Sequence, residues 1–320
     1  MIDYSHIVGQ YGSNVQVFGA NSAAAGVTWQ SWIKPRGISM VQILLLGGGG
    51  GGGASVAGAA STAAGGGGGG SSAQSIALFP AAFLPDVLSI SVGVGGAGGS
   101  GGSGIASYVS VIENTTVNHL LMQATGGTGG GVASGATAGS AGGAGAVTTI
   151  ANSPLAGLGM FGWGAAATNV SLAGQAGIIG GTTVAGAALT LPVTGLIVTG
   201  GTGGGGLPAV SNAGSAGGAF TTPGSGLFFP AQAGGIGGLT TPTAGGNGSN
   251  GMNFINKLFY FYGGTGGASS GMSGSAGVAG GNGGCGGIGC GGGGGGGSFT
   301  GFGPAVGGRG GDGICVIICW

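Results

Sequence analysis

Few residues of this chain could carry out acid–base or nucleophilic chemistry. The two histidines, His6 and His119, have no serine or cysteine partner in a recognisable catalytic motif. The acidic residues lie at least 27 positions apart, so they form no carboxylate pair of the glycosidase type by proximity in sequence. They are Asp3, Asp86, Glu113 and Asp312. The pattern predicts a protein that is not an enzyme.

The cysteines are the next candidates for chemistry, and they lie near the end of the sequence. They are Cys285, Cys290, Cys315 and Cys319. Their spacings, CxxxxC and CxxxC, are looser than the CxxC knuckles of zinc sites. The pattern favours reduced, buried thiols, with a disulfide from Cys285 or Cys290 to the last strand, or a metal site, as alternatives. Beside this strand, Arg309 and Asp312 predict a structural ion pair.

Aromatic side chains gather in three segments between glycine runs, "LGMFGW" from residue 158, "FTTPGSGLFFP" from 220 and "MNFINKLFYFY" from 252. Exposed aromatic residues on loops make efficient contact surfaces for glycans or proteins. We expect these excursions at the far ends of the glycine runs to carry function. The alternative is that they cap the runs or fill a subunit interface, which we favour for "LFYFY". The candidate contact residues are Met160, Phe161, Trp163, Phe220, Phe228, Phe229, Asn253 and Phe254.

Charge is almost absent, with four basic and four acidic residues among 320 and a formal net charge of zero. So few cations cannot form a nucleic-acid-binding patch. Apolar runs are too short to span a membrane, and no lysine lies in a GxxxxGK[ST] phosphate loop. The first residues lack the basic and apolar regions of a signal peptide, which predicts synthesis in a cytoplasm. We expect no cofactor.

Glycine dominates the composition, with 94 residues. An apolar strand followed by a glycine run recurs as "LLMQATGGTGGG", "LIVTGGTGGGG" and "LFYFYGGTGGA", whose GGTGG motifs begin at Gly126, Gly200 and Gly263. Each is followed by a second glycine segment that begins with "GSAG". The repeated unit is therefore a strand, a glycine run, an excursion and a returning glycine run.

No segment has convincing helical periodicity, and glycine and β-branched residues disfavour helix throughout. In "LSISVGV" (88–94), apolar and small residues alternate as in a half-buried strand. We predict an all-β fold with a single domain over residues 26–320 and an attachment segment over residues 1–25. The expected strands lie near 27–46, 86–94, 105–125, 193–199, 254–262 and 314–320. The expected glycine runs are 47–70, 95–104, 126–147, 200–219 and 263–297.

The glycine runs have no side chains to bury, so their order must come from the backbone. A polyproline-II-type helix has three residues per turn and no internal hydrogen bonds, which leaves its N–H and C=O groups free for neighbours. Only glycine lets such neighbours approach closely. We therefore expect a jelly-roll-like β-sandwich with an inserted bundle of polyglycine II helices.

Two terminal segments carry a family resemblance. "VTWQSWIKPRGISMVQILLLGGGGGGG" (27–53) and "GGRGGDGICVIICW" (307–320) resemble the first and last strands of glycine-rich domains in phage virion proteins. The GGTGG runs with variable excursions are similar to tail-fibre tip adhesins of T-even-type phages, and the layout is similar to the glycine-rich region of anaplastic lymphoma kinase receptors. The adhesin resemblance implies a polyglycine-helix sandwich whose loops bind a host receptor.

The resemblance and the composition together predict a non-enzymatic phage virion component, a spike or fibre-tip adhesin for host attachment. The alternative is a purely structural capsid decoration or head-fibre protein. Its expected partners are other virion proteins, further copies in a homotrimer, and a host cell-surface glycan or protein. A nearly uncharged, apolar chain also predicts poor solubility as an isolated monomer, which favours a permanent assembly.

Overall fold

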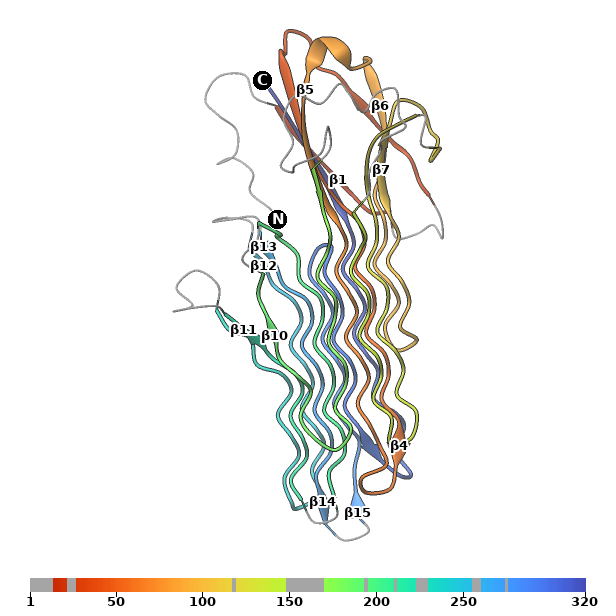
Figure 1. The fold of residues 1–320 in the computed structure, drawn as a ribbon, viewed down its shortest axis with the longest axis vertical. Helices are drawn as coiled ribbons and strands as arrows, with labels where there is room; N and C mark the ends of the chain where they lie inside the picture. The colour runs from red at the N-terminus through yellow and green to blue at the C-terminus, as the bar shows by residue number, and fades with distance from the viewer. Residues whose placement is uncertain are drawn as a thin grey trace.

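The computed structural model describes residues 14–21, 27–116, 119–147, 170–192, 195–209, 212–222, 230–254, 260–273 and 276–320. These residues form an elongated molecule with two β-sheets at one end and long glycine-rich runs, lying side by side, that reach the other end (Figure 1). They include no helix of seven or more residues, and a three-residue 3-10 helix, η1 (Ala81–Phe83), follows one strand. Within these ranges no helix is long and apolar enough to cross a membrane.

The larger sheet has five antiparallel strands in the order β1-β17-β3-β5-β9. Their bounds are β1 (Asn14–Gly19), β17 (Ile314–Cys319), β3 (Met40–Leu46), β5 (Gln74–Pro80) and β9 (Val170–Leu172). The last strand of the chain therefore lies between the first strand and β3. This pairing brings the chain ends together, with Val17 opposite Val316 and Val316 opposite Leu44.

The smaller sheet has four antiparallel strands in the order β2-β6-β7-β8. Their bounds are β2 (Gln30–Ile33), β6 (Val87–Ser91), β7 (Ser107–Ser110) and β8 (Leu120–Ala124). One hydrophobic cluster joins its inward side chains to those of the larger sheet. Trp32 of β2, Ile43 of β3 and Cys315 of β17 are all fully buried in this cluster. The two open sheets therefore pack face to face.

Four further pairs of two-residue strands lie among the glycine runs. They are β4 (Ala57–Gly58) with β16 (Ser298–Phe299), β10 (Leu189–Thr190) with β11 (Phe220–Thr221), β12 (Asn253–Phe254) with β13 (Tyr260–Phe261), and β14 (Met272–Ser273) with β15 (Ala276–Gly277). β4, β14 and β15 mark the end of the molecule far from the two sheets, whereas β10–β13 lie in the half of the bundle nearer to the sheets, with β10 and β11 partway along it (Figure 1).

The run at 48–56 illustrates how the glycine segments are held together. Its N–H groups donate to three neighbouring runs in turn, so that Gly48, Gly51 and Ala54 all donate to the same run at 2.8–2.9 Å. The accepting runs are 99–105, 305–311 and 64–70. The carbonyl groups of the run accept with the same three-residue period from three others. These donating runs are 96–99, 127–130 and 292–295. Six runs therefore surround this one, and its backbone groups are satisfied by them.

The close approach of these runs leaves no room for a side chain. A Cβ atom at Gly50 would lie 2.0 Å from the carbonyl oxygen of Thr128, and one at Gly53 would lie 1.9 Å from that of Gly131. Both distances are far below any real contact of a Cβ atom. The opposing atoms belong to backbone, which cannot move aside without breaking its own hydrogen bonds. Glycine is therefore required wherever a carbonyl group of a neighbouring run occupies the place of a Cβ atom, as at Gly50 and Gly53.

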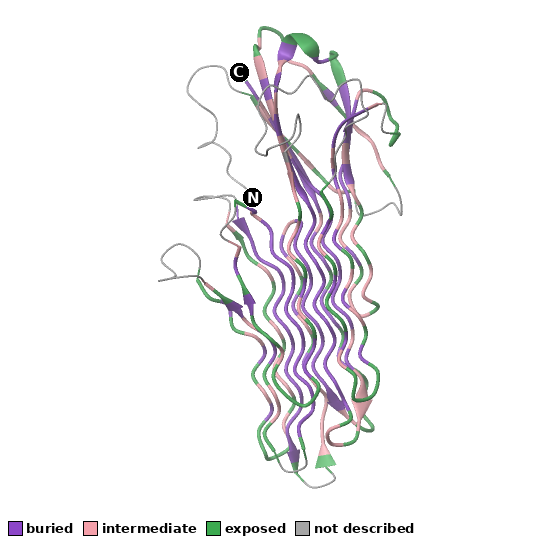
Figure 2. Cartoon of the chain, in the orientation of Figure 1, coloured by how far each residue is buried: buried purple, intermediate pink, exposed green. Residues whose placement is uncertain are grey.

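This requirement explains where the longest glycine blocks lie. The uninterrupted blocks at 47–53, 65–70 and 291–297 are buried throughout and occupy the interior of the bundle (Figure 2). Peripheral runs carry a larger residue at every third position, which faces solvent. In the run from 230 to 239, Pro230, Ala233, Ile236 and Leu239 are exposed.

Some donors in the bundle meet a side-chain oxygen in place of a carbonyl group. The hydroxyl group of Thr202, which is fully buried, accepts from the N–H of Gly266 at 2.8 Å and donates to the carbonyl oxygen of Gly218 at 2.7 Å. Thr199 Oγ1 accepts in the same way from the N–H of Gly263 at 2.7 Å. The threonines of the GGTGG segments thus belong to the backbone network.

The structure confirms a predominantly β fold, and strands lie within most of the expected ranges. The expected polyglycine helices are not seen as helices, because the runs are extended segments without internal bonds. Three strands of the two sheets were missed: β5, β9, and β1, which lies inside the expected attachment segment 1–25 and pairs with β17. The short strands β4, β10, β11, β14, β15 and β16 were missed as well. The range 193–199 has only an isolated bridge, at Val198, among its described residues.

Gly50→Ala is expected to destabilise the protein by about 3 kcal/mol, at the upper end of overpacking costs, because its Cβ atom would collide with Thr128 O. Gly303→Ala is the matched control, because nothing lies within 4 Å of a Cβ atom at Gly303. Its expected effect is below about 0.5 kcal/mol. Urea unfolding followed by circular dichroism measures both. Equal stabilities of the two variants would contradict backbone-on-backbone packing.

Thr202→Val keeps the shape of the side chain and removes its hydroxyl group. It leaves the buried N–H of Gly266 without its 2.8 Å acceptor, which costs about 1–3 kcal/mol. Thr202→Ser is the control, because it keeps the hydroxyl group and loses only a methyl group. Thermal unfolding midpoints should rank wild type first, then the serine variant, then the valine variant. A valine variant at least as stable as the serine variant would refute a role for the hydroxyl group.

Candidate binding surfaces

An aromatic cluster closes one side of the glycine bundle at the end nearer to the sheets. Phe220, Tyr260 and Tyr262 are buried there with Leu189 and Leu191. The ring of Tyr262 stacks on Phe220 at 5.7 Å and meets Tyr260 edge-on at 5.6 Å. β10 and β11 pair side by side within the cluster, although they are far apart in the sequence. The cluster is therefore a small second core.

The phenol groups of this cluster are hydrogen-bond donors. Tyr262 Oη donates to the carbonyl oxygen of Pro230 at 3.2 Å, and Tyr260 Oη to that of Pro192 at 3.5 Å. Burial raises the pKa of Tyr262 to about 12. Burial, with smaller contributions from Cys290 and Tyr262, raises the pKa of Tyr260 further. Both groups thus stay neutral at physiological pH, as the donor role requires.

The candidate contact residues differ in their accessibility. Phe220 is only 1% exposed, so it fills the aromatic cluster and presents no surface. Asn253 is exposed, and Phe254 is half-buried with its ring edge-on to Tyr262 at 5.3 Å. The remaining candidates lie outside the described residues. They are Met160, Phe161, Trp163, Phe228 and Phe229.

The structure describes the flanks of two aromatic excursions. β11, β12 and β13, which form these flanks, lie in the half of the bundle nearer to the sheets (Figure 1). The glycine runs alternate in direction, so successive connections fall at opposite ends of the bundle. The flanks of these excursions fall in the near half, and small-residue turns such as β14–β15 form the far end. Sequence alone did not reveal which end each connection occupies.

An asparagine ladder on the bundle surface was missed by the sequence analysis. Asn247, Asn250 and Asn253 lie three residues apart, and their Oδ1 atoms accept from backbone N–H groups three apart in the run 282–288, at 2.8–3.0 Å. Asn282 Oδ1 continues the pattern by accepting from the next run, at Val306 N, at 2.8 Å. The side-chain oxygen of Asn253 thereby bonds within the fold, whereas the side-chain NH₂ group can donate to a partner. The three-residue spacing of these asparagines in the sequence could have revealed the ladder.

The four cysteines are free thiols, and their environments differ. Cys285 is exposed on the run beside the asparagine ladder, whereas the other three are buried. Cys315 and Cys319 lie on the same face of β17, as expected, and pack between the sheets. Cys290 packs on the opposite face of the larger sheet, where burial raises its pKa to about 12. Each buried thiol thus belongs to a hydrophobic cluster, and two of them also donate a hydrogen bond, Cys290 to Phe261 O at 3.1 Å and Cys319 to Asn14 O at 3.4 Å.

Charged groups meet in two places among the described residues. Arg309 and Asp312 form the expected ion pair before β17, with Nη1 3.3 Å from Oδ2, and Asp312 Oδ1 also accepts from Gly95 N at 2.8 Å. The second place is a pocket at the end of the sandwich, where Lys34 Nζ lies 3.1 Å from Asp86 Oδ1. Across the described ranges, no group of three or more His, Cys, Asp or Glu side chains could hold a metal ion.

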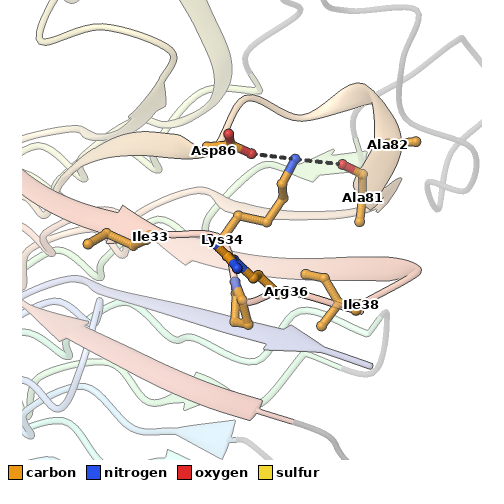
Figure 3. Close-up of a pocket in the computed structure, with 9 residues that line it drawn as sticks. Ile33, Lys34, Arg36, Ile38, Ala81, Ala82 and Asp86 are labelled. Atoms are coloured by element: carbon orange, nitrogen blue, oxygen red, sulfur yellow. Dashed lines mark hydrogen bonds and ion pairs between the residues drawn. The ribbon is translucent and has the colours of Figure 1, made fainter.

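The pocket at the sandwich end has a volume of about 470 Å³ (Figure 3). Its wall consists of the turn after β2 and the 3-10 helix η1. The lining residues are Ile33–Ile38, Ala81, Ala82 and Asp86. Gly37 has a φ of +80°, a left-handed conformation that closes this tight turn. The pocket therefore combines apolar walls with two cations and one carboxylate.

Comparison with known proteins places the chain in a family. A family model described as a glycine-rich domain matches residues 23–188, which is 166 of the 320 residues. The match includes β2 to β9 and the first two glycine blocks. No curated protein matches the chain. Because the match covers more than half of the sequence, this chain belongs to the glycine-rich domain family.

Proposed function

We propose that this protein is a structural component of a phage virion, a spike or fibre-tip adhesin that presents loops for attachment to the host surface. The observation that carries the proposal is the bundle of glycine runs, of which 48–56 is bonded to its neighbours through backbone groups, with the hydroxyl group of Ser55 added at one end. Such a scaffold is long, nearly uncharged and bonded mainly through its backbone. These properties suit a projecting part of a particle better than they suit an enzyme.

The proposal includes polyglycine II helices as the conformation of the runs. A helix of this type has three residues per turn and no internal hydrogen bonds, so its N–H groups point in three directions. The donors of 48–56 change neighbour with a three-residue period, which is what this geometry requires. The two packed sheets serve as a jelly-roll-like base from which the helices extend.

Attachment would use the excursions beside the aromatic cluster. The cluster anchors β11, β12 and β13 through buried rings, so the connections that follow them start from fixed positions. A host glycan or protein is the expected partner, because aromatic loop residues bind both. Asn253 adds exposed amide donors at the same end of the bundle.

Assembly would use the outer face of the five-stranded sheet. Leu44, Ile76 and Ile318 line a small apolar pocket of about 190 Å³ on this face, with Ile197 and Val316. An apolar surface that is covered by another copy would explain how a chain with almost no charge stays soluble. We propose a homotrimer that forms through this face.

A capsid decoration protein is the second candidate. Large apolar side chains on the flank of the bundle favour it, because Ile236 is 80% exposed and Leu239 is 61% exposed. A protein wedged between capsomers would cover such side chains over its whole length. The two functions therefore predict different positions on the particle.

The location of the protein is the direct test of a virion role. Particles from the source culture are purified on a density gradient, and peptides of this chain are measured by mass spectrometry along the gradient. Immunogold labelling then locates the chain. We expect the chain to co-sediment with particles and the label to lie on distal projections. Label spread over the shell would favour decoration, and absence of the chain from intact particles would refute both functions.

The oligomeric state tests the proposed assembly face. We expect light scattering to give three times the chain mass of 28.9 kDa, and Ile318→Asn to shift the protein toward monomer. Ile33→Asn is the control, because Ile33 is 69% exposed at the other side of the sandwich and should not change the mass. A wild-type monomer, or equal effects of both variants, would contradict assembly through this face.

A further inference from the structure

The pocket at the sandwich end contains a cation without a partner. No hydrogen bond or ion pair joins Arg36 to any residue within the described ranges, and the side chain is exposed. In Figure 3 the dashed lines run from Lys34 to Asp86 and Ala81, and none reaches Arg36. The other described arginine, Arg309, is held by Asp312. A guanidinium group that lines a cavity and is not used by the fold is available to a ligand.

Hydrogen bonds of Lys34 hold the rest of the pocket wall in place. Lys34 Nζ donates to the carbonyl oxygen of Leu84 at 2.7 Å and to that of Ala81 at 3.3 Å, and its backbone N–H donates to Asp86 O at 2.8 Å. These bonds fix the loop after η1 to the end of β2. With all three of its ammonium protons directed to the loop, Lys34 contributes charge and shape, and Arg36 contributes the free donors.

The charges of the pocket select the kind of anion. Lys34 and Arg36 contribute two positive charges and Asp86 one negative charge, which leaves a net charge of +1. A carboxylate carries the single negative charge that balances this, and its two oxygens fit the paired N–H groups of a guanidinium. A phosphate dianion would remain half-compensated beside Asp86. The pocket thus favours a carboxylate.

The apolar wall indicates what carries the carboxylate. Ile33 and Ile38, with Ala81 and Ala82, supply apolar side chains to the lining, and the exposed ring of Phe83 lies at the end of η1. A volume of about 470 Å³ accommodates a ligand larger than a simple acid. Sugar rings have apolar faces that pack on such walls while their hydroxyl groups stay in water.

We propose that this pocket binds a carboxylated sugar, with the carboxylate held by both terminal nitrogens of Arg36 and the ring packed on Ile33 and Ile38. A uronic acid is the simplest ligand of this class. The inference does not depend on a virion role, because it rests on the cavity, the unpaired cation and the net charge alone.

The test is a titration of the full chain by isothermal calorimetry at low ionic strength, with glucuronate, glucose and acetate as separate probes. We expect glucuronate to bind at least tenfold more tightly than either glucose, which lacks the charge, or acetate, which lacks the ring. Added salt should weaken this binding, because the cation is exposed. Absence of glucuronate binding, or equal affinities for glucuronate and glucose, would overturn the proposal. Equal affinities for glucuronate and acetate would overturn the role of the apolar wall.

Variants assign the binding to Arg36. Arg36→Gln should weaken glucuronate binding at least tenfold, and Arg36→Lys should have an intermediate effect because a lysine cannot form the two parallel bonds. Arg309→Gln is the matched control, since it removes an arginine outside the pocket and should leave the affinity unchanged. Thermal unfolding of each variant verifies folding. An Arg36→Gln variant that is folded and binds like the wild type would overturn the assignment.

Discussion

The structure depends on the distance between neighbouring backbones. Wherever two interior runs meet, a carbonyl oxygen of one run occupies the space that a Cβ atom of the other would need. A Cβ atom placed on Gly52 would lie 2.0 Å from the carbonyl oxygen of Gly293, and one on Gly69 would lie 2.1 Å from that of Gly50. Glycine has the largest conformational entropy to lose on folding. The compensation comes from hydrogen bonds on all sides of each run, which are possible only at this distance. The absence of a side chain therefore causes both the large entropy loss of glycine on folding and the close approach that allows these hydrogen bonds.

The same constraint explains the chemistry of the rest of the chain. Some N–H groups in the runs meet no backbone carbonyl group of a neighbouring run and need another acceptor. Neutral side-chain oxygens supply it, as Thr265 Oγ1 does for Ser249 N at 2.7 Å and Asn250 Oδ1 does for Cys285 N at 2.9 Å. Charged side chains would have to lose their hydration to serve in the same way. The near absence of charge is thus part of the scaffold, with Asp312 the exception at its rim.

The sequence allowed the principle of the fold to be predicted, but only part of its arrangement. Backbone packing followed from glycine blocks such as 47–53, and the last strand followed from its apolar composition. The edge strand β1 was missed because its pairing partner lies at the other end of the chain. Phe220 was expected on the surface, yet it is buried against residues that only the lateral order of the runs brings near. Local patterns identify the runs, whereas the order in which the runs pack depends on contacts far apart in sequence.

This separation suggests how such a chain can vary. The glycines that face neighbouring runs determine how the bundle packs. Every third residue of an outer run, such as Ala233 and Ile236, faces solvent instead. Residues at these places can change without altering the distance between backbones on which the bundle depends. A scaffold of this kind keeps one architecture while its surface chemistry changes, and it restricts recognition to the ends and the outer rows.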